Sequence, residues 1–157
     1  MPESRKENKV TTPSELEVQK AIGHQFPGGD YLIQHWENFL LTDCTGSEAL
    51  PDGLVHPVAL FHVPILGAGT TISEMFSLGL ATSEFSIGIE SYEWELFTPL
   101  YEDVNYQISG SIMDAERIVD ENDRVQDRIQ FRFDIKHSGE LIARTTVIWH
   151  YGRGTTE

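Results

Sequence analysis

The sequence contains very little cysteine. Cys44 is the only cysteine among 157 residues, so no disulfide can form within the chain. Small secreted domains that cannot build a large core usually depend on several disulfides. The single thiol therefore excludes a disulfide-stabilised secreted scaffold.

Positive charge is also scarce. The chain has 11 Lys and Arg residues against 25 Asp and Glu residues, which gives a formal net charge of −14. Such a field repels phosphate backbones and anionic lipid surfaces. We expect neither nucleic acid nor a membrane as a partner. A local group of arginines and lysines would still permit an anionic ligand such as a CoA thioester.

Long apolar runs are missing as well. The longest one, from Leu54 to Ala68, is broken by His56, Pro57, His62, Pro64 and Gly67. It falls short of the roughly 20 apolar residues that a membrane-spanning helix needs. Residues 1–10 are polar and charged, without the apolar region of a signal peptide. We expect a soluble, cytoplasmic protein.

The residues that are present predict one globular domain. Hydrophobic residues make up 39% of the chain and aromatic residues 10%, which is enough material for a core. We expect a flexible leader over residues 1–13, a single domain over 14–152 and a tail over 153–157. Ser14 and Glu17 match a capping box, which predicts a helix from about residue 15 to 22.

The middle of the chain predicts mixed structure. Residues 31–41 favour a strand, with a short helix around 36–41 as the alternative, and residues 43–53 favour a loop. From Thr70 to Leu80 the apolar residues recur at helical spacing, and Glu74 is the only charged residue among them. This pattern predicts a helix that is largely surrounded by protein.

The C-terminal half changes to the period of a strand. Alternation of apolar and polar residues predicts strands over 92–96, 106–112, 129–136 and 141–151, with Ser138 and Gly139 as a hairpin turn. Residues 114–128 are charged and favour either a solvated loop or an extension of the strands. The fold class is therefore α+β, with an antiparallel sheet whose apolar face is covered by one central helix.

Three segments resemble MaoC-like acyl-CoA hydratases and dehydratases. They are His56–Phe61 with the following Pro64 and Gly67, Trp94–Val104, and His137–Arg144. The second segment departs from the family, because Glu102 stands where the family has a glycine. The resemblance spans about residues 50–151 and implies a hot-dog fold, in which a long sheet wraps around one helix. It also implies hydro-lyase activity on an enoyl or 3-hydroxyacyl thioester.

The resemblance implies candidate catalytic residues. Asp52 and His56 occupy the place of the family's Asp and His dyad, although the intervening Asn-Pro is missing and the spacing is one residue short. A lost dyad would instead make the chain similar to the substrate-accommodating partner in heteromeric hydratases, whose active residues lie on a second, homologous subunit. The resemblance also extends to a half domain of a fatty acid synthase-like dehydratase.

A second pair of residues resembles another group of hot-dog enzymes. His62 followed by Glu74 is similar to the His and Glu of β-hydroxyacyl carrier-protein dehydratases, although the intervening loop is about two residues short. In that chemistry the His removes the α proton and the carboxyl group handles the departing hydroxyl. Burial of His62 within its apolar run, or exposure of Glu74 on a surface stripe, would give each residue a structural role instead.

Hydration also needs donors that stabilise an enolate oxygen. Gly67, Gly69 and Thr70 would let peptide N–H groups at a helix start approach a ligand, although plain helix packing explains the same residues. Arg144 is a candidate for a CoA phosphate, with a solvated sheet face as the alternative. The six histidines and one cysteine form no closely spaced ligand cluster, so we expect no metal and no cofactor.

Three functions from different classes remain open. The first is a hydro-lyase acting on a CoA or carrier-protein thioester, or a subunit of one. The second is a hot-dog thioesterase, with Glu74 or Asp43 assisting water, and the third is a non-catalytic, substrate-binding partner subunit. An unpaired sheet edge predicts either a homo-oligomer or a heteromer with another hot-dog chain.

Overall fold

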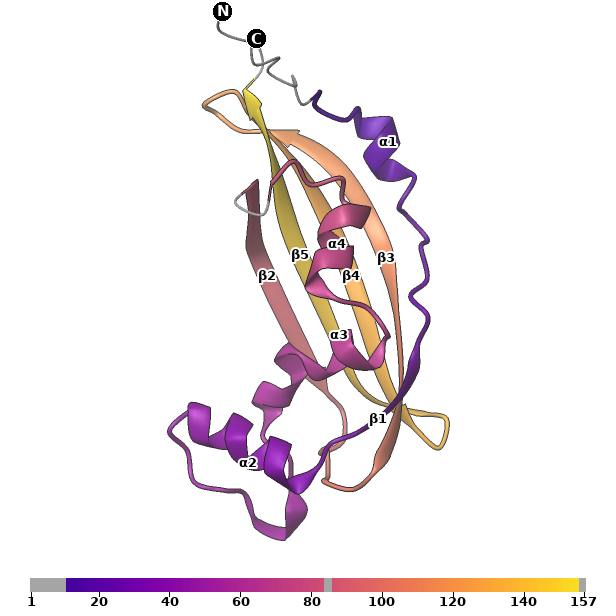
Figure 1. Cartoon of the computed structure of the whole chain (residues 1–157), viewed down its shortest axis with the longest axis vertical. Helices are drawn as coiled ribbons and strands as arrows, with labels where there is room; N and C mark the ends of the chain where they lie inside the picture. The colour runs from indigo at the N-terminus through magenta and orange to yellow at the C-terminus, as the bar shows by residue number, and fades with distance from the viewer. Residues whose placement is uncertain (1–10, 84–85, 156–157) are drawn as a thin grey trace, which may run out of the picture.

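The computed structural model describes residues 11–83 and 86–155. Its elements are shown in Figure 1 and follow in chain order: α1 (Glu15–Gln19), β1 (Gly29–Leu32), α2 (His35–Cys44), η1 (Pro51–Gly53), η2 (Pro57–Phe61), α3 (Val63–Gly67), α4 (Ile72–Leu78), β2 (Ile87–Leu96), β3 (Asn105–Val119), β4 (Arg124–His137) and β5 (Glu140–Thr155). None of these helices is long and apolar enough to cross a membrane.

One antiparallel sheet of five strands forms the frame, in the order β1-β3-β4-β5-β2. The long strands curve, and α3 and α4 lie across the sheet on one side (Figure 1). This arrangement confirms the α+β class and the sheet wrapped around helical structure.

Alternation along the strands determines which face the helices cover. The four apolar residues predicted for one face of β4 are all buried, namely Ile129, Phe131, Phe133 and Ile135. The hairpin after β4 is also confirmed, because Ser138 and Gly139 both have positive φ values of 49° and 83°, as a type I′ turn requires. The C-terminal half of the chain thus folds as its binary pattern predicts.

The charged segment 114–128 continues the strands and does not form a loop. β3 runs to Val119 and β4 starts at Arg124, so only a tight turn separates them. Opposite charges face each other across this ladder, since Glu116 is the register partner of Arg128 and forms an ion pair with it. The composition of this segment alone does not distinguish a loop from a strand. Cross-strand pairs of opposite charge stabilise the strand.

The helix predicted over residues 70–80 is confirmed as α4, and a short helix that was not predicted, α3, precedes it. Gly69, with a φ of +73°, lies between α3 and α4, and Thr71 then caps the second helix by accepting the Glu74 N–H. The prediction that this helix is surrounded by protein is wrong for α4, in which only Met75 is buried. The physical reason is that the helix is short. About one turn of it covers the sheet, and its other residues are exposed to solvent.

The N-terminal elements also differ in detail from the expectation. The capping box of Ser14 and Glu17 is confirmed, and α1 ends at Gln19. In the segment 31–41 the helical alternative is correct, because β1 ends at Leu32 and α2 begins at His35.

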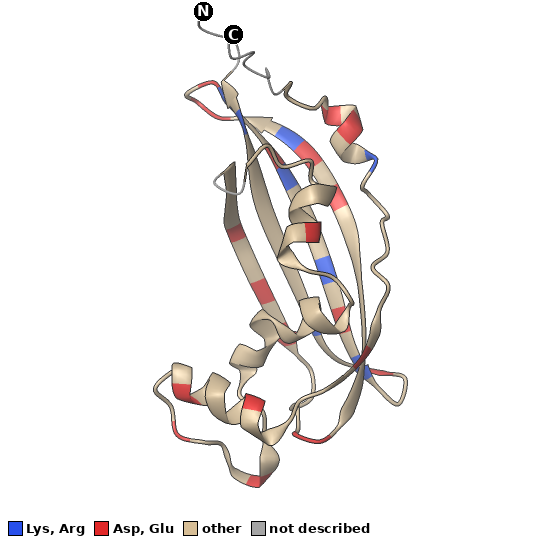
Figure 2. Ribbon diagram, in the orientation of Figure 1, with Lys and Arg blue, Asp and Glu red and all other residues tan. Residues whose placement is uncertain are grey.

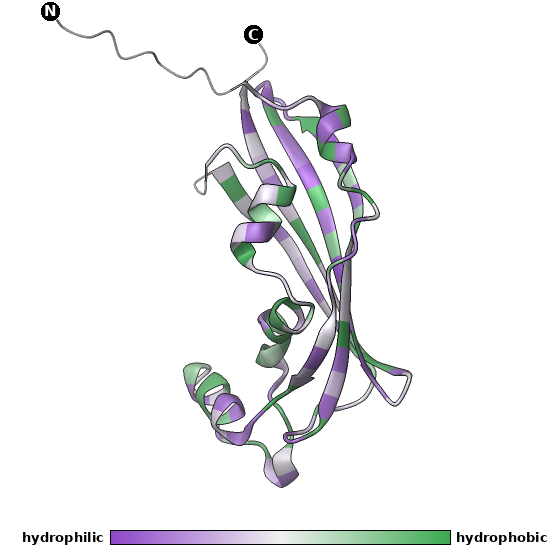
Figure 3. Ribbon diagram, turned by 45° about the vertical axis from the view of Figure 1, so that its right-hand side comes forward, coloured by the Kyte–Doolittle hydropathy of each residue, from purple (hydrophilic) through white to green (hydrophobic). Residues whose placement is uncertain are grey.

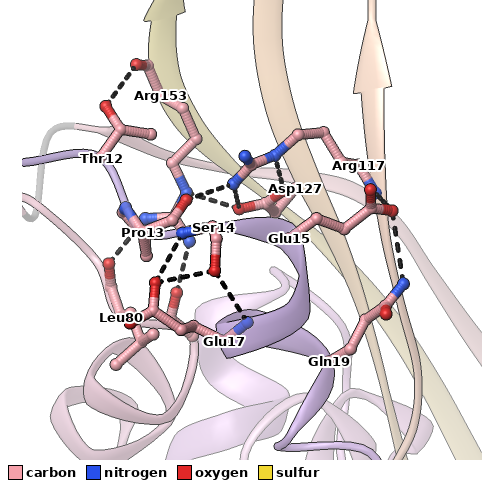
Figure 4. A network of polar contacts seen from close by, with 11 residues as sticks. Thr12, Pro13, Ser14, Glu15, Glu17, Gln19, Leu80, Arg117, Asp127 and Arg153 are labelled. Carbon is pink, nitrogen blue, oxygen red and sulfur yellow. Dashed lines mark hydrogen bonds and ion pairs between the residues drawn. The ribbon is translucent and has the colours of Figure 1, made fainter.

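A buried ionic network joins the residue before α1 and the segment after α4 to the sheet (Figure 4). The Asp127 carboxylate is fully buried and accepts hydrogen bonds from Arg117 at 2.8 and 3.0 Å and from Arg153 at 2.6 Å. Arg153 also donates to the Leu80 carbonyl just after α4, and Arg117 donates to the Pro13 carbonyl before α1. A single carboxylate thus fastens both helices to the sheet.

The Asp127→Asn substitution should destabilise the protein strongly. It leaves two guanidinium groups, one of them fully buried, without their counter-charge, and such a loss costs about 3–5 kcal/mol. Asp134→Asn is the matched control, because Asp134 makes a similar bidentate pair with Arg144 on the half-exposed face of the sheet. The control should cost about 1 kcal/mol or less. Urea denaturation measures both, and equal losses would contradict the prediction.

Candidate functional site

An apolar pocket lies between the helical segment and strands β2 and β5. Its volume is about 250 Å³, and it is lined by Phe61, His62, Ile65, Leu66, Thr71, Ile72, Ile89, Tyr92 and Trp149. Pockets of this character hold an apolar ligand body and use a few polar groups to orient it. The polar groups available here are those of His62, Thr71, Tyr92 and Trp149.

Two aromatic residues form the wall on the side of the sheet. The Tyr92 hydroxyl donates to the Phe61 carbonyl at 2.8 Å. The rings of Tyr92 and Phe61 stack with their centroids 5.4 Å apart. Burial raises the pKa of Tyr92 to about 12, so it remains a neutral donor at physiological pH. Trp149 is buried, and its indole N–H has no hydrogen-bond partner within the described chain, so an oxygen from a ligand or water is needed to satisfy it.

His62 enters the pocket wall with a carboxylate behind it. Its Nε2 lies 3.3 Å from Oε1 of Glu37, and the Tyr31 hydroxyl donates to the same oxygen at 2.6 Å. The His62 side chain is 33% exposed and that of Glu37 only 11%. Burial, and then the hydrogen bond to Glu37, hold the pKa of Tyr31 above its ordinary value. His62 is therefore a partly accessible residue of the pocket and not a core histidine.

This arrangement has a defined proton chemistry. An ionised Glu37 favours the tautomer with a proton on Nε2, which leaves the Nδ1 lone pair of His62 to accept a proton. Carboxylates commonly orient a catalytic imidazole in this way and stabilise its charged form. The Tyr31, Glu37 and His62 side chains can thus act together as a general base.

Asp52 and His56 are close in sequence but have separate roles here. Asp52 is exposed, within η1, at a φ of 58°. His56 uses its Nδ1 to accept the Val58 N–H at 3.1 Å, which caps η2. Within the described residues no hydrogen bond joins the two side chains. The assignment of a catalytic dyad to them remains a prediction.

The loop that carries His56 is positioned by Asn38 of α2. Asn38 is buried, and its amide donates to the Leu54 carbonyl at 3.0 Å and to Glu102 at 2.7 Å. Its Oδ1 accepts the His56 N–H at 3.1 Å. The bond from Asn38, and then that from His35, holds the pKa of Glu102 below its ordinary value. One amide therefore joins α2, the loop and the turn before β3.

Glu74 and Thr70 lie together at the start of α4. The Thr70 hydroxyl is buried and donates to Glu74 Oε2 at 2.8 Å, while Glu74 itself is exposed. Thr71 and Ile72 of this turn line the pocket, but Glu74 does not. The structure therefore brings His62 to the pocket without the carboxylate that the resemblance pairs with it.

Close packing explains Gly67, the last residue of α3, and Gly69, which lies between α3 and α4. A Cβ on Gly67 would lie 2.3 Å from Ile108 of β3, and one on Gly69 would lie 3.3 Å from Pro27. The N–H groups of Ala68, Gly69 and Thr70 already donate to carbonyls of the α3 segment. Their predicted role in binding an enolate oxygen remains a prediction.

Arg144 is on the opposite face of the sheet from the pocket. It alternates with the buried Ala143 and Thr145 and pairs with Asp134. The predicted contact with a CoA phosphate remains untested, and the pocket lining itself contains no lysine or arginine. No group of three or more His, Cys, Asp or Glu residues that could hold a metal occurs among the described residues.

Helix α2 has its polar side buried and its apolar side exposed. Glu37, Asn38 and Thr42 are buried, whereas Trp36, Phe39 and Leu40 are 60%, 54% and 51% exposed. Figure 3 shows hydrophobic and hydrophilic residues side by side around this helix. Sequence reasoning missed Glu37 and Tyr31, because it singled out no polar residue of the segment 31–41. Their contact with each other and with His62 depends on packing between α2, β1 and the segment before α3.

Comparison with known proteins finds likeness in structure only. No protein-family model matches the chain, and no curated protein matches it either. A chain of the ChsH1-ChsH2 complex from Mycobacterium tuberculosis superposes with a TM-score of 0.67 at 9% identity, covering 91% of both chains. The HadBC (3R)-hydroxyacyl-ACP dehydratase complex of the same organism gives a TM-score of 0.63 at 7% identity, over 83% of this chain and 96% of that one. The chain has the hot-dog fold.

Proteins with different activities share this fold. A predicted thioesterase from Bacillus stearothermophilus has a TM-score of 0.56 at 12% identity, over 85% of this chain and 88% of that one. The hot-dog fold is therefore shown, whereas identities of 7–12% do not determine the activity of this chain. The two mycobacterial structures are complexes of hot-dog subunits, so partnering between such subunits is a property of these structural relatives.

Two substitutions on α2 should differ sharply in effect. Asn38→Ala leaves the His56 N–H and the Leu54 carbonyl without partners in a partly buried site, which should cost about 1–3 kcal/mol. Phe39→Ala removes a larger but exposed side chain of the same helix and should change the free energy of unfolding by less than about 0.5 kcal/mol. Chemical denaturation of both variants measures this, and a larger loss for Phe39→Ala would show that its apolar side belongs to the core.

Proposed function

We propose that the chain is a subunit of a hot-dog hydro-lyase that adds water to, or removes it from, an acyl thioester. The acyl chain occupies the apolar pocket, and His62 transfers the proton. The observation that carries the proposal is the position of His62, oriented by Glu37 at 3.3 Å, in the wall of a pocket that is otherwise mostly apolar. The resemblance to MaoC-like dehydratases supports the reaction class.

The reaction that this site supports can be written with its protons. In hydration, water adds its oxygen to the β carbon of an enoyl thioester while His62 accepts the proton that the water releases. The α carbon takes up a proton, and the thioester oxygen carries negative charge in between. Dehydration is the reverse, with His62 returning the proton to the departing hydroxyl. The unpaired indole N–H of Trp149 is a donor near the acyl chain.

The second proton-transfer group is not apparent within this pocket. Neither Asp52 nor Glu74 lines it. A partner hot-dog subunit therefore supplies the rest of the active site in this proposal. Strand β2 borders the pocket through Ile89 and Tyr92 and is the outer strand of the sheet, so a partner that pairs with it would lie beside the pocket.

A non-catalytic, substrate-binding subunit is the second candidate. It is favoured by the small number of polar groups in the pocket and by the use of the His56 ring as a helix cap. The two candidates differ in one respect, since only the hydro-lyase requires the His62 imidazole for turnover. Both require the pocket to bind an acyl chain.

Thioester binding and turnover test the proposal. Enoyl-pantetheine thioesters of increasing length should bind the wild-type chain, with affinity rising by about 0.8 kcal/mol for each buried CH₂ until the pocket is full. Turnover, followed by loss of enoyl absorbance, should fall at least about 100-fold in His62→Gln with binding retained. Glu37→Gln should lower kcat by a smaller factor than His62→Gln does, and it should leave KM nearly unchanged.

The matched controls are Asp52→Ala and His56→Gln. They should leave kcat within about twofold if His62 is the base. Loss of activity in these two variants, with His62→Gln active, would instead assign catalysis to the Asp52 and His56 pair. Binding without turnover in the wild type would favour the non-catalytic subunit. Absence of binding at every chain length would exclude both candidates.

A further inference from the structure

Strand β2 has one residue more than β5 at Glu90. Ile89 is the register partner of Trp149, and Ser91 is the partner of Ile148, so Glu90 lies between two consecutive pairs without a partner of its own. An extra residue of this kind is a β-bulge, which re-aims the side chains next to it. The sequence shows the same break, because Glu90 and Ser91 are two polar residues in succession within an alternating strand.

The bulge determines which residues of β2 line the pocket. Ile89 and Tyr92 both line it, although they are an odd number of residues apart. In a regular strand, residues at an odd spacing point to opposite faces of the sheet. Without the bulge, one of these two side chains would turn away from the pocket. Tyr92 also holds the Phe61 carbonyl, directly before His62, through its hydroxyl.

The side chain of Glu90 lies on the opposite face of the sheet from the pocket. It contacts Arg128 of β4 and His150 of β5, which are register partners of each other. Their neighbours Ile129 and Trp149 are buried on the inner face, and successive residues of a strand point to opposite faces. Figure 2 shows the charges involved, since β2 carries acidic residues only and basic residues lie on the central strands.

Glu90 has several partners on this outer face. Arg128 donates to both of its carboxylate oxygens, from Nε at 2.6 Å and from Nη2 at 2.8 Å. Nε2 of His150 lies against the same carboxylate, and Nδ1 of His150 lies 2.5 Å from Oε1 of Gln126. Arg128, and then His150, lower the pKa of Glu90 to about 2, so the carboxylate is ionised at physiological pH. These contacts tie β2 to β5 and β4.

Burial of apolar side chains fixes this end of β2 only weakly. Ile89 is 56% exposed, and Gly88 has no side chain to bury. Exposed ion pairs usually contribute little, but bidentate geometry and membership of a charge network are the conditions under which they do contribute. Glu90 meets both conditions, because Arg128 also pairs with Glu116 of β3. The contacts of Glu90 therefore supply a restraint on the bulge that burial does not.

We propose that Glu90 is a positioning residue of the acyl pocket: held by Arg128 and His150 on the outer face, it fixes the bulge that turns both Ile89 and Tyr92 toward the acyl chain. Glu90 touches no ligand itself and acts through these two wall residues. The inference rests on the proposed function for its assumption that the pocket holds an acyl chain. It adds the interaction that shapes the pocket wall from the far side of the sheet.

Glu90→Ala tests this role, with Glu116→Ala as the matched control. Both substitutions remove one carboxylate from Arg128, but only Glu90 lies in the bulge. Affinity for enoyl-pantetheine thioesters should rise about fourfold for each CH₂ in the wild type and the control, and less than about twofold in Glu90→Ala, whose apolar wall is incomplete. Titration calorimetry with the full chain measures these dissociation constants.

A second variant approaches the same pair from its other end. Arg128→Met keeps an apolar side chain of similar length and should reproduce the result for Glu90→Ala. The double variant should show no further loss, because both substitutions break the same pair. Additive losses in the double variant would contradict a shared role.

Nuclear Overhauser contacts report the bulge without any thioester. Register partners on one face have Cβ atoms within about 5.5 Å of each other, so the Ile89 methyl groups should contact the Trp149 indole ring in the wild type and in Glu116→Ala. This contact should be lost in Glu90→Ala. Its retention there would overturn the proposal, and so would an unchanged increment per CH₂.

Failure of the proposed function has a different signature. If the wild type binds thioesters of no length, the reaction is excluded, whereas the Overhauser contact still shows whether Glu90 holds the bulge. If Glu90→Ala binds and turns over thioesters as the wild type does, the reaction is retained and the role of Glu90 is excluded.

Discussion

The concave face of β3, β4 and β5 must be covered by apolar side chains, and the rest of the structure depends on this requirement. Alternate residues of β4, such as Phe131 and Phe133, are fully buried against the segment that includes Phe26 and the short helices. Because α3 and α4 together cover only part of that face, a pocket remains between them and β2. The same incomplete cover that limits the core thus creates the candidate binding site.

Helix α2 links the pocket to the outer surface. Its polar side is turned inward, where Glu37 orients His62 and Asn38 holds the loop that precedes η2. Trp36, Phe39 and Leu40 of the same helix are consequently exposed. In the proposed function, one short helix therefore orients the proton-transfer group and positions the loop before η2.

Charge has a different distribution from hydrophobicity. The segment 21–116 contains fourteen acidic residues and no lysine or arginine, whereas the long strands balance their charges through pairs such as Arg117 with Asp127 and Arg144 with Asp134. The balanced pairs stabilise the sheet. Glu93 and Glu95 on β2 are exposed and contribute little to the fold.

The sequence by itself determined the local structure: the capping box at Ser14, the alternation along β4 and β5, and the turn at Gly139 each depend on neighbouring residues only. The resemblance also indicated the hot-dog fold. Only the tertiary structure decided which polar groups meet. Glu37 and His62 are 25 residues apart and come together because α2 packs with its polar side inward, and Arg144 turns away from the pocket because the register of β5 places it beside Asp134. Such contacts depend on packing between distant segments, which no local pattern encodes.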